Sequence, residues 1–204
     1  MVNFQEEKKW WKQGYEFVAG LDEVGRGSLA GPVVAAAVCI RQFQISNFKF
    51  QINDSKKLST GKREEIHEII INHPDILWGI GVVSEKIIDK VNILQATKLA
   101  MKTAAENLPI PADFLLLDGN FLLDTDISQK AIIKGDQKVF SIAAASIIAK
   151  VTRDRLMQKM HKKYPQYGFA NHKGYGTVLH LKNLAAFGPA VIHRKTFFPI
   201  SKMV

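Results

Sequence analysis

Four acidic residues of this chain stand at the ends of predicted strands or loops close to glycines, a setting that suits metal-dependent chemistry. They are Asp22, Glu23, Asp118 and Asp136. Carboxylate oxygens without His or Cys partners are the ligands that Mg²⁺ and Mn²⁺ prefer. Two such ions about 4 Å apart can activate a water molecule and stabilise the leaving oxygen of an in-line phosphoryl displacement. If the four carboxylates meet in space, they therefore predict a two-metal site acting on a phosphodiester.

Two alternatives apply to the stretch from Gly20 to Pro32 that holds the first acidic pair. Asp and Glu beside glycine are common in solvated turns, so each carboxylate taken singly also fits a surface turn. A phosphate-binding loop fits less well, because the glycines at 25, 27 and 31 do not follow the G-x-G-x-x-G spacing. In addition, no Walker lysine follows, and Pro32 leads into a strand pattern where a phosphate site would need a helix.

The acidic residues stand next to apolar runs that predict strands. Residues 17–19 and 33–40 flank the first pair and are rich in β-branched and small apolar side chains. Residues 113–119 form a continuous apolar run that ends in Asp118 and Gly119, typical of a central parallel strand. Residues 131–136 repeat that design and end in Asp136. Open α/β sheets place their chemistry at such strand ends.

Helices are predicted between and after these strands. Apolar spacing and caps indicate helices from Ser59 to about residue 71, from Ser84 to Asp89, from Asn92 to about 108, at 140–163 and at 178–187. Strands that alternate with helices predict an α/β fold, a mixed sheet with helices on both faces. We expect an N-terminal segment 1–16 docked through Trp10, Trp11 and Tyr15, a core at 17–155, and a basic helical part at 156–204.

The net positive charge of the chain comes from its last quarter. The net charge is +9 over 204 residues, and residues 155–204 hold nine Lys and Arg and no acidic residue. This distribution indicates a polyanionic partner held on one side of the molecule. A solvated basic face without a partner is the alternative.

The single cysteine, Cys39, lies in an apolar run and is expected to be buried and inert. The N-terminus lacks an apolar signal region, and we expect a cytoplasmic monomer that does not contact a membrane.

The stretch from Gly20 to Pro32 closely resembles the N-terminal signature of bacterial ribonuclease HII, the type 2 ribonuclease H. Further blocks similar to that family follow in family order at 53–56, 92–97, 117–119, 134–136, 143–154, 173–177 and 193–194. The resemblance implies a ribonuclease H-like fold with a five-stranded mixed sheet and a helical C-terminal part. By the same resemblance, two Mg²⁺ or Mn²⁺ ions are held by the four acidic residues, Asp22, Glu23, Asp118 and Asp136.

The resemblance also implies how the substrate is held. Gly25, Arg26 and Gly27 match the turn that contacts the ribonucleotide 2′-hydroxyl, and Tyr175 matches the tyrosine that stacks on the sugar at the RNA–DNA junction. A loop aromatic packed on the core is the alternative for Tyr175. Candidates for substrate or phosphate contacts are Asn53, Lys56, Asn92, Thr97, Lys150, Lys173 and Arg194. Each of these taken alone fits a solvated charge or a helix cap equally well.

The implied function is hydrolysis 5′ to a ribonucleotide in an RNA/DNA hybrid or in duplex DNA with an embedded ribonucleotide. Two other functions stay open at this point, a different ribonuclease H-like nuclease and a hybrid-binding module without catalysis. The histidines of the basic quarter show no ligand spacing and are expected to be surface or phosphate-neighbouring groups; they are His161, His172, His180 and His193.

Overall fold

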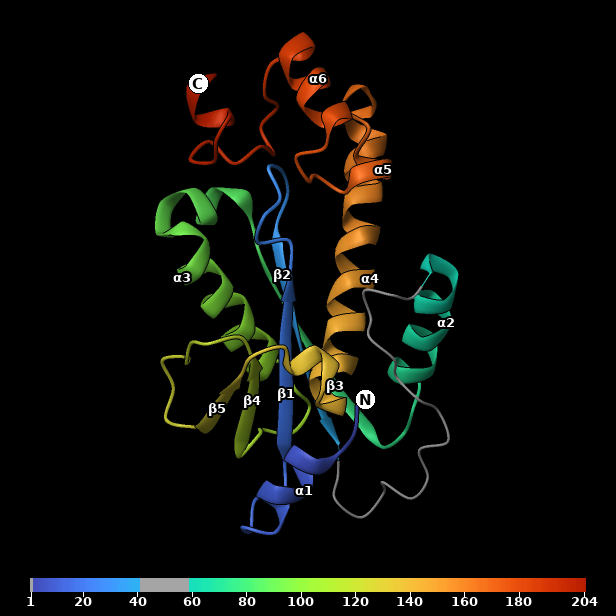
Figure 1. Cartoon of the computed structure of the whole chain (residues 1–204), viewed down its shortest axis with the longest axis vertical. Helices are drawn as coiled ribbons and strands as arrows, with labels where there is room; N and C mark the ends of the chain where they lie inside the picture. The colour runs from blue at the N-terminus through green and yellow to red at the C-terminus, as the bar shows by residue number, and fades with distance from the viewer. Residues whose placement is uncertain (1, 41–58) are drawn as a thin grey trace.

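A mixed five-stranded sheet with the order β3-β2-β1-β4-β5 forms the centre of the computed structural model, which describes residues 2–40 and 59–204 (Figure 1). β1 pairs antiparallel with β2, and β2 pairs antiparallel with β3, whereas β4 runs parallel to both β1 and β5. The predicted α/β fold with a five-stranded mixed sheet is therefore confirmed. The strands are β1 Val18–Val24, β2 Val33–Ile40, β3 Ile76–Val83, β4 Phe114–Asp118 and β5 Ser128–Ile132.

Helices cover both faces of this sheet, and further helices extend beyond it at the C-terminal end (Figure 1). No helix among the described residues combines the length and apolar character that crossing a bilayer requires. The α-helices are α1 Gln5–Trp11, α2 Thr60–Ile71, α3 Glu85–Glu106, α4 Phe140–Lys163, α5 Phe169–His172 and α6 Val178–Phe187. Short 3₁₀ turns lie at Gly135–Gln137, Pro165–Tyr167 and Ile200–Lys202.

Small residues let the two long helices approach the sheet closely. On one face, Gly81 of β3 lies against the backbone of α3, where a Cβ would collide with the Ala100 carbonyl. On the other face, the first half of α4 is buried against β1 and β2. Its run Ala143–Ala145 presents only methyl groups to the sheet, so the helix backbone can lie close to the strands that end at the acidic pair.

The N-terminal segment is attached at the start of α4. The Trp10 ring stacks on Phe114 with centroids 3.9 Å apart, and Trp11 is buried. Glu7 accepts hydrogen bonds from the backbone N–H and the hydroxyl of Ser141, both at 2.8 Å. Because α4 lacks a capping side chain of its own, Glu7 satisfies one of its first N–H groups from another helix. The carboxylate also lies where the helix dipole favours negative charge.

The helices predicted on either side of Asn92 are present, and the predicted domain boundary differs from the structure. The helices expected at 84–89 and from Asn92 are the two halves of α3, which meet at a kink at Asn92 with φ 68° and ψ 167°. The Asn92 Oδ1 atom accepts from the N–H groups of Leu94 and Gln95, so it caps the second half of α3. α4 continues without a break through Arg155, so the expected boundary between core and C-terminal part falls inside a helix.

Candidate active site

Strand pairing brings the acidic residues of β1 and β4 to one edge of the sheet. The parallel register pairs Leu21 with Leu117, so Asp22 and Asp118 are the next residues along the two strands. The register with β2 places Ala36 opposite Asp22. The structure thus brings together carboxylates that are almost a hundred residues apart in the chain.

These carboxylates line a cavity of about 250 Å³. Side chains alternate along a strand, so Asp22 and Glu23 would leave on opposite faces unless the turn re-aims one of them. Both line this cavity. Asp22 is 5% exposed, and its Oδ1 accepts from the backbone N–H of Glu23 at 2.7 Å. The lining residues are Asp22, Glu23, Val24, Arg63, Asp118, Ser146, Lys150 and Tyr175.

The electrostatics of the cavity disfavour bare carboxylates. Burial, and then the charges of Glu23 and Asp118, raise the pKa of Asp22 well above its ordinary value, while a hydrogen bond with Ser146 acts in the other direction. Burial also raises the pKa of Glu23, although the nearby Arg26 guanidinium at 3.2 Å lowers it. Like charges therefore crowd in a site that is partly closed to water.

The acidic residues fit a divalent cation. All of their ligand atoms are oxygens, and the Oε2 atom of Glu23 is buried and accepts no hydrogen bond from the described residues. A cation would relieve the repulsion that raises the pKa of Asp22 and would use that oxygen. The residues that line the cavity thus match the oxygen donor set of Mg²⁺ or Mn²⁺.

Asp136 lies beside this group without lining the cavity. It belongs to the 3₁₀ turn before α4, and its side chain is only 1% exposed. The preceding residue, Gly135, donates its N–H to Asp118 Oδ1 at 2.7 Å. The backbone therefore links the turn that carries Asp136 to the Asp118 carboxylate.

The turn at Gly25, Arg26 and Gly27 follows directly after β1 and lies beside the cavity. Gly25 adopts φ 96°, and a Cβ there would collide with the Arg153 side chain, so both the conformation and the space require glycine. Arg26 and Gly27 are exposed. The Arg26 guanidinium pairs with Glu23, which couples the turn to the acidic group.

Arg194 is placed differently from the expected phosphate contact. It is fully buried, and its guanidinium donates to the carbonyl oxygens of Gly25, Arg26 and Gly31 at 2.7–3.1 Å. Arg153 is also fully buried, with bonds to the carbonyls of Ala30, Pro32 and Lys173. Because these carbonyls use most of the N–H groups of Arg194, the structure gives it the role of holding the turn in place.

Tyr175 lies on the wall of the cavity and is partly exposed. An antiparallel bridge links it to Ser28, and the Arg153 guanidinium lies 5.5 Å from the centre of its ring. The loop that carries Tyr175 is thereby joined to the loop that follows the acidic pair.

The remaining substrate candidates fall into three groups. Lys150 lines the cavity, where its Nζ pairs with Asp154 at 2.8 Å, and Lys173 lies in the Tyr175 loop. Asn92 and Thr97 belong to α3; Asn92 acts as an internal cap, and Thr97 is fully buried. Asn53 and Lys56 lie outside the described residues.

The C-terminal histidines were expected to be surface or phosphate-neighbouring groups, and the surface position is wrong for three of the four. His172, His180 and His193 are 8%, 0% and 1% exposed. They pack on one another beneath the Tyr175 loop, because nearby backbone groups satisfy their ring nitrogens. Histidine spacing along the chain gives no signal for such an arrangement.

Arg63 and Ser146 also line the cavity, and sequence reasoning did not select them as site residues. Arg63 occupies the buried face of α2 together with Ile66 and Ile70, at helical spacing. A charged residue on an apolar stripe is a signal that could have identified it. Ser146 interrupts a run of alanines and isoleucines on α4, which is a comparable signal.

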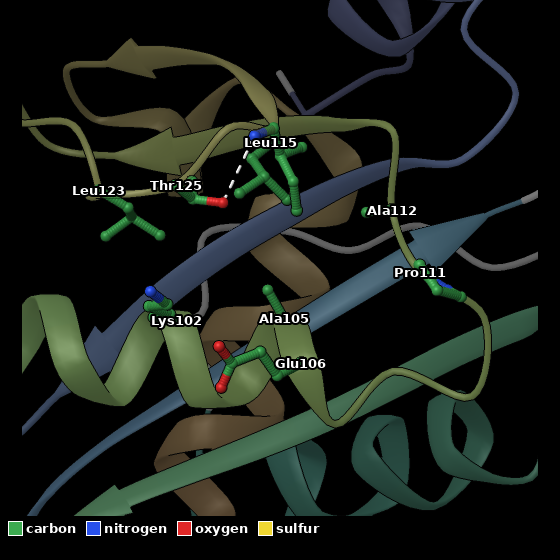
Figure 2. Close-up of a pocket in the computed structure, with 9 residues that line it drawn as sticks. Lys102, Ala105, Glu106, Pro111, Ala112, Leu115, Leu123 and Thr125 are labelled. Atoms are coloured by element: carbon green, nitrogen blue, oxygen red, sulfur yellow. Dashed lines mark hydrogen bonds between the residues drawn. The ribbon is translucent and has the colours of Figure 1, made fainter.

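Two other places in the structure are less suited to this chemistry. Glu64, His67 and Glu68 of α2 bring ligand atoms within 4.8 Å of one another, but Arg155 already pairs with both carboxylates. Figure 2 shows a cavity of about 280 Å³ beside α3, where Leu115 and Leu123 contribute apolar side chains. Its apolar lining lacks the grouped carboxylates of the first cavity.

Both the sequence and the fold of this chain match known proteins. The sequence model of the family described as Ribonuclease HII matches residues 19–199. A relative named Ribonuclease HII from Chlamydia caviae is 53% identical over 198 residues, which cover 97% of this chain and 92% of that protein. Another of that name, from Acetivibrio thermocellus, is 54% identical over 192 residues, 94% of this chain and 73% of that protein.

Solved structures share the fold. The crystal structure of ribonuclease H2 from Pyrococcus horikoshii OT3 superposes with a TM-score of 0.75 at 29% identity, covering 92% of this chain and 96% of that one. Bst-RNase HIII, crystallised in complex with Mn²⁺, has a TM-score of 0.67 at 18% identity, covering 93% and 69%. At that level of identity the second likeness concerns the fold alone.

Proposed function

The chain belongs to the ribonuclease HII family and is an endoribonuclease; on that premise we propose that it hydrolyses the phosphodiester 5′ to a ribonucleotide. Its substrates are RNA/DNA hybrids and duplex DNA with single embedded ribonucleotides. The products are a 5′-phosphate and a 3′-hydroxyl. The observation that carries this proposal is the convergence of Asp22, Glu23, Asp118 and Tyr175 on one cavity.

We propose that Asp22, Glu23 and Asp118 hold the divalent cations, Mg²⁺ or Mn²⁺, with Asp136 joining from the adjacent turn. When bound, such ions supply activation of the attacking water and stabilisation of the negative charge that develops on the phosphate. The chain contributes oxygen donors that are already close together. Ser146 orients the Asp22 carboxylate through a hydrogen bond, and the Gly135 N–H orients that of Asp118.

Other residues of the cavity position the nucleic acid. Lys150 and Arg63 line the same wall as the carboxylates and supply positive charge for the phosphates on either side of the cleaved bond. Tyr175 offers a ring for stacking on the sugar at the junction. The turn at residues 25–27, exposed at Arg26 and Gly27, offers backbone groups to the 2′-hydroxyl, which distinguishes RNA from DNA.

Three duplexes of the same sequence test the proposal. One holds a single ribonucleotide, one is an RNA/DNA hybrid, and one is all DNA. We expect cleavage of the first two in Mg²⁺ or Mn²⁺, cutting 5′ to the ribonucleotide, and no cleavage in EDTA. Cleavage of the all-DNA duplex would indicate a different nuclease, and binding in Mn²⁺ without cleavage would indicate a binding module.

A further inference from the structure

Three buried histidines form a cluster under the loop that carries Tyr175, and the proposed chemistry uses none of them. His172 comes from α5, His180 from α6, and His193 from the segment after α6. The rings of His172 and His180 stack with centroids 4.4 Å apart, and the Nε2 atoms of His180 and His193 are 3.1 Å apart. Two ring nitrogens at that distance share a single proton, so the tautomers of the cluster are linked.

Backbone groups fix the direction of that shared hydrogen bond. The Ala190 N–H donates to His193 Nδ1 at 2.8 Å, so His193 carries its proton on Nε2. His180 must then accept at Nε2 and carry its own proton on Nδ1, which lies 2.9 Å from the Tyr175 carbonyl oxygen. The Ala190 carbonyl at 3.1 Å would suit the opposite tautomer, but the shorter N–H contact excludes a proton on His193 Nδ1.

His172 holds the other side of the same residue. Its carbonyl accepts the Tyr175 N–H at 2.9 Å. Its ring accepts from the Gly174 N–H at 3.2 Å and donates from Nε2 to the Tyr167 carbonyl at 2.8 Å. Both backbone polar groups of Tyr175 are therefore bonded to histidines of this cluster, and the Thr177 N–H donates to the same carbonyl at 2.8 Å. The cluster thus helps to place the Tyr175 backbone and, with it, the ring.

The surroundings of the cluster favour neutral rings. Burial lowers the pKa of His180 to about 4, and the neighbouring His172 and His193 act in the same direction. Burial is also the main cause that lowers the pKa of His172, with Lys173 and His161 facing it as further positive groups. A neutral imidazole has one donor and one acceptor, as a hydrogen-bond chain with a single direction requires.

We propose that His180 is a positioning residue: its neutral ring, held in the Nδ1–H tautomer by the hydrogen bond with His193, donates to the Tyr175 carbonyl and so fixes the Tyr175 ring on the cavity wall. This inference rests on the proposed function for the role of Tyr175. It goes beyond that function by assigning a task to a buried group that does not contact the nucleic acid.

A matched pair of amide variants separates the two hydrogen bonds of His180. In His180→Asn the amide nitrogen replaces Nδ1 and keeps the bond to Tyr175, whereas in His180→Gln the amide reaches the position of Nε2 and keeps only the bond to His193. We expect His180→Asn to cleave a singly ribo-substituted duplex within about twofold of wild type, and His180→Gln to lose roughly tenfold in kcat. In a Tyr175→Ala background, the same two substitutions should differ by less than about twofold. Equal losses of kcat in His180→Asn and His180→Gln would overturn the proposal. So would a tenfold difference between the two variants that persists in the Tyr175→Ala background.

NMR of the intact chain provides a readout that does not depend on cleavage. Imidazole ¹⁵N shifts should show His180 protonated at Nδ1, and His172 and His193 protonated at Nε2. These shifts should stay constant between pH 6 and 8, the range in which an ordinary histidine, with a pKa of about 6.5, changes its protonation. The carbonyl ¹³C shift of Tyr175 should move in His180→Gln and stay in His180→Asn. Opposite tautomers, or titration near pH 6.5, would overturn the proposal. If wild type failed to cleave, the proposed function would fall, and these shifts would still decide the positioning of Tyr175.

Discussion

The guanidinium of Arg194 donates to the carbonyl oxygen of Gly25 at 2.7 Å, although the two residues are 169 positions apart in the chain. Gly25 begins the turn proposed to contact the ribose. The same side chain also bonds to the carbonyls of Arg26 and Gly31. A residue near the C-terminal end of the chain therefore sets the shape of the loop that follows the first acidic pair.

Replacing Arg194 should destabilise the protein and lower its activity. Arg194→Met leaves several buried carbonyls without a donor, at a cost of roughly 3 kcal/mol in the free energy of unfolding. Urea denaturation measures this cost. Arg155→Met is the control, because Arg155 makes two ion pairs at an exposed site and its loss should cost less than about 1 kcal/mol. Similar values for both variants would contradict a special role for Arg194.

Removing one carboxylate of the cavity should abolish turnover without unfolding the chain. We expect Asp22→Asn and Asp118→Asn each to lower kcat by roughly a thousandfold or more. Both should still bind a duplex with an embedded ribonucleotide. Asp126→Asn, at an exposed loop position, serves as the control and should cleave normally. Metal-dependent turnover near the wild-type rate in either cavity variant would refute the assignment.

Adding and removing the metal should change stability only when the cavity is intact. Mn²⁺ at about a hundred times its Kd should stabilise the wild-type chain by about 2.7 kcal/mol, and EDTA should reverse this. Asp118→Asn should respond less, because it lacks one of the ligands. Thermal unfolding with and without Mn²⁺ gives this comparison, and an equal shift in both proteins would place the ion elsewhere.

The buried carboxyl of Glu7 should make stability depend on pH. Burial raises its pKa from 4.5 to about 7. The folded protein thus holds this proton more tightly than the unfolded chain, so the free energy of unfolding falls as the pH rises from about 4.5 to 7. Above pH 7 the loss is complete and amounts to about 3 kcal/mol. Glu7→Gln should therefore be more stable than wild type at pH 8.5, and the two should converge toward pH 5 in urea titrations.

Glu6→Gln is the control for this pH dependence. Glu6 is a neighbour in α1 whose partly exposed ion pair with Lys130 should contribute less than about 1 kcal/mol. An advantage of Glu7→Gln that did not grow with pH would contradict the assignment of a raised pKa to Glu7.

Basic residues of the C-terminal part should set the salt dependence of duplex binding. Removing Lys162, Lys163 and Lys182 together, as Gln, should lower the slope of log K against log salt by roughly one for each lysine that contacts a phosphate. The Asp118→Asn variant allows binding to be measured without cleavage. A matched triple variant of Lys8, Lys9 and Lys12 removes the same charge at the other end of the molecule. Equal slopes in the two triple variants would place the duplex elsewhere.

Strand patterns predicted a mixed sheet, and they made a meeting of Asp22 with Asp118 conditional on their strands being neighbours. The parallel pairing of β1 with β4 meets that condition, because parallel strand ends share an edge. Strand patterns did not predict the buried state of Arg194 or His180. Arg194 is buried because backbone carbonyls distant in sequence satisfy it, and His180 because the Tyr175 carbonyl and the His193 ring do. Residue periodicity carries no record of such partners. The alternation of side chains along a strand also does not predict that Asp22 and Glu23 line one cavity. The two residues lie where the strand ends and the turn begins, so the alternation stops there.

The continuity of α4 fixes the reach of the enzyme along its substrate. Ser146 near the acidic cavity and Lys163 at the last turn belong to one unbroken helix, which spans ~25 Å between them at 1.5 Å per residue. A straight duplex advances 3.4 Å per base pair, so a duplex lying along α4 from the cavity would meet Lys163 roughly seven base pairs from the proposed cut. The helix thus acts as a rigid spacer between the cavity and the lysines of its last turn.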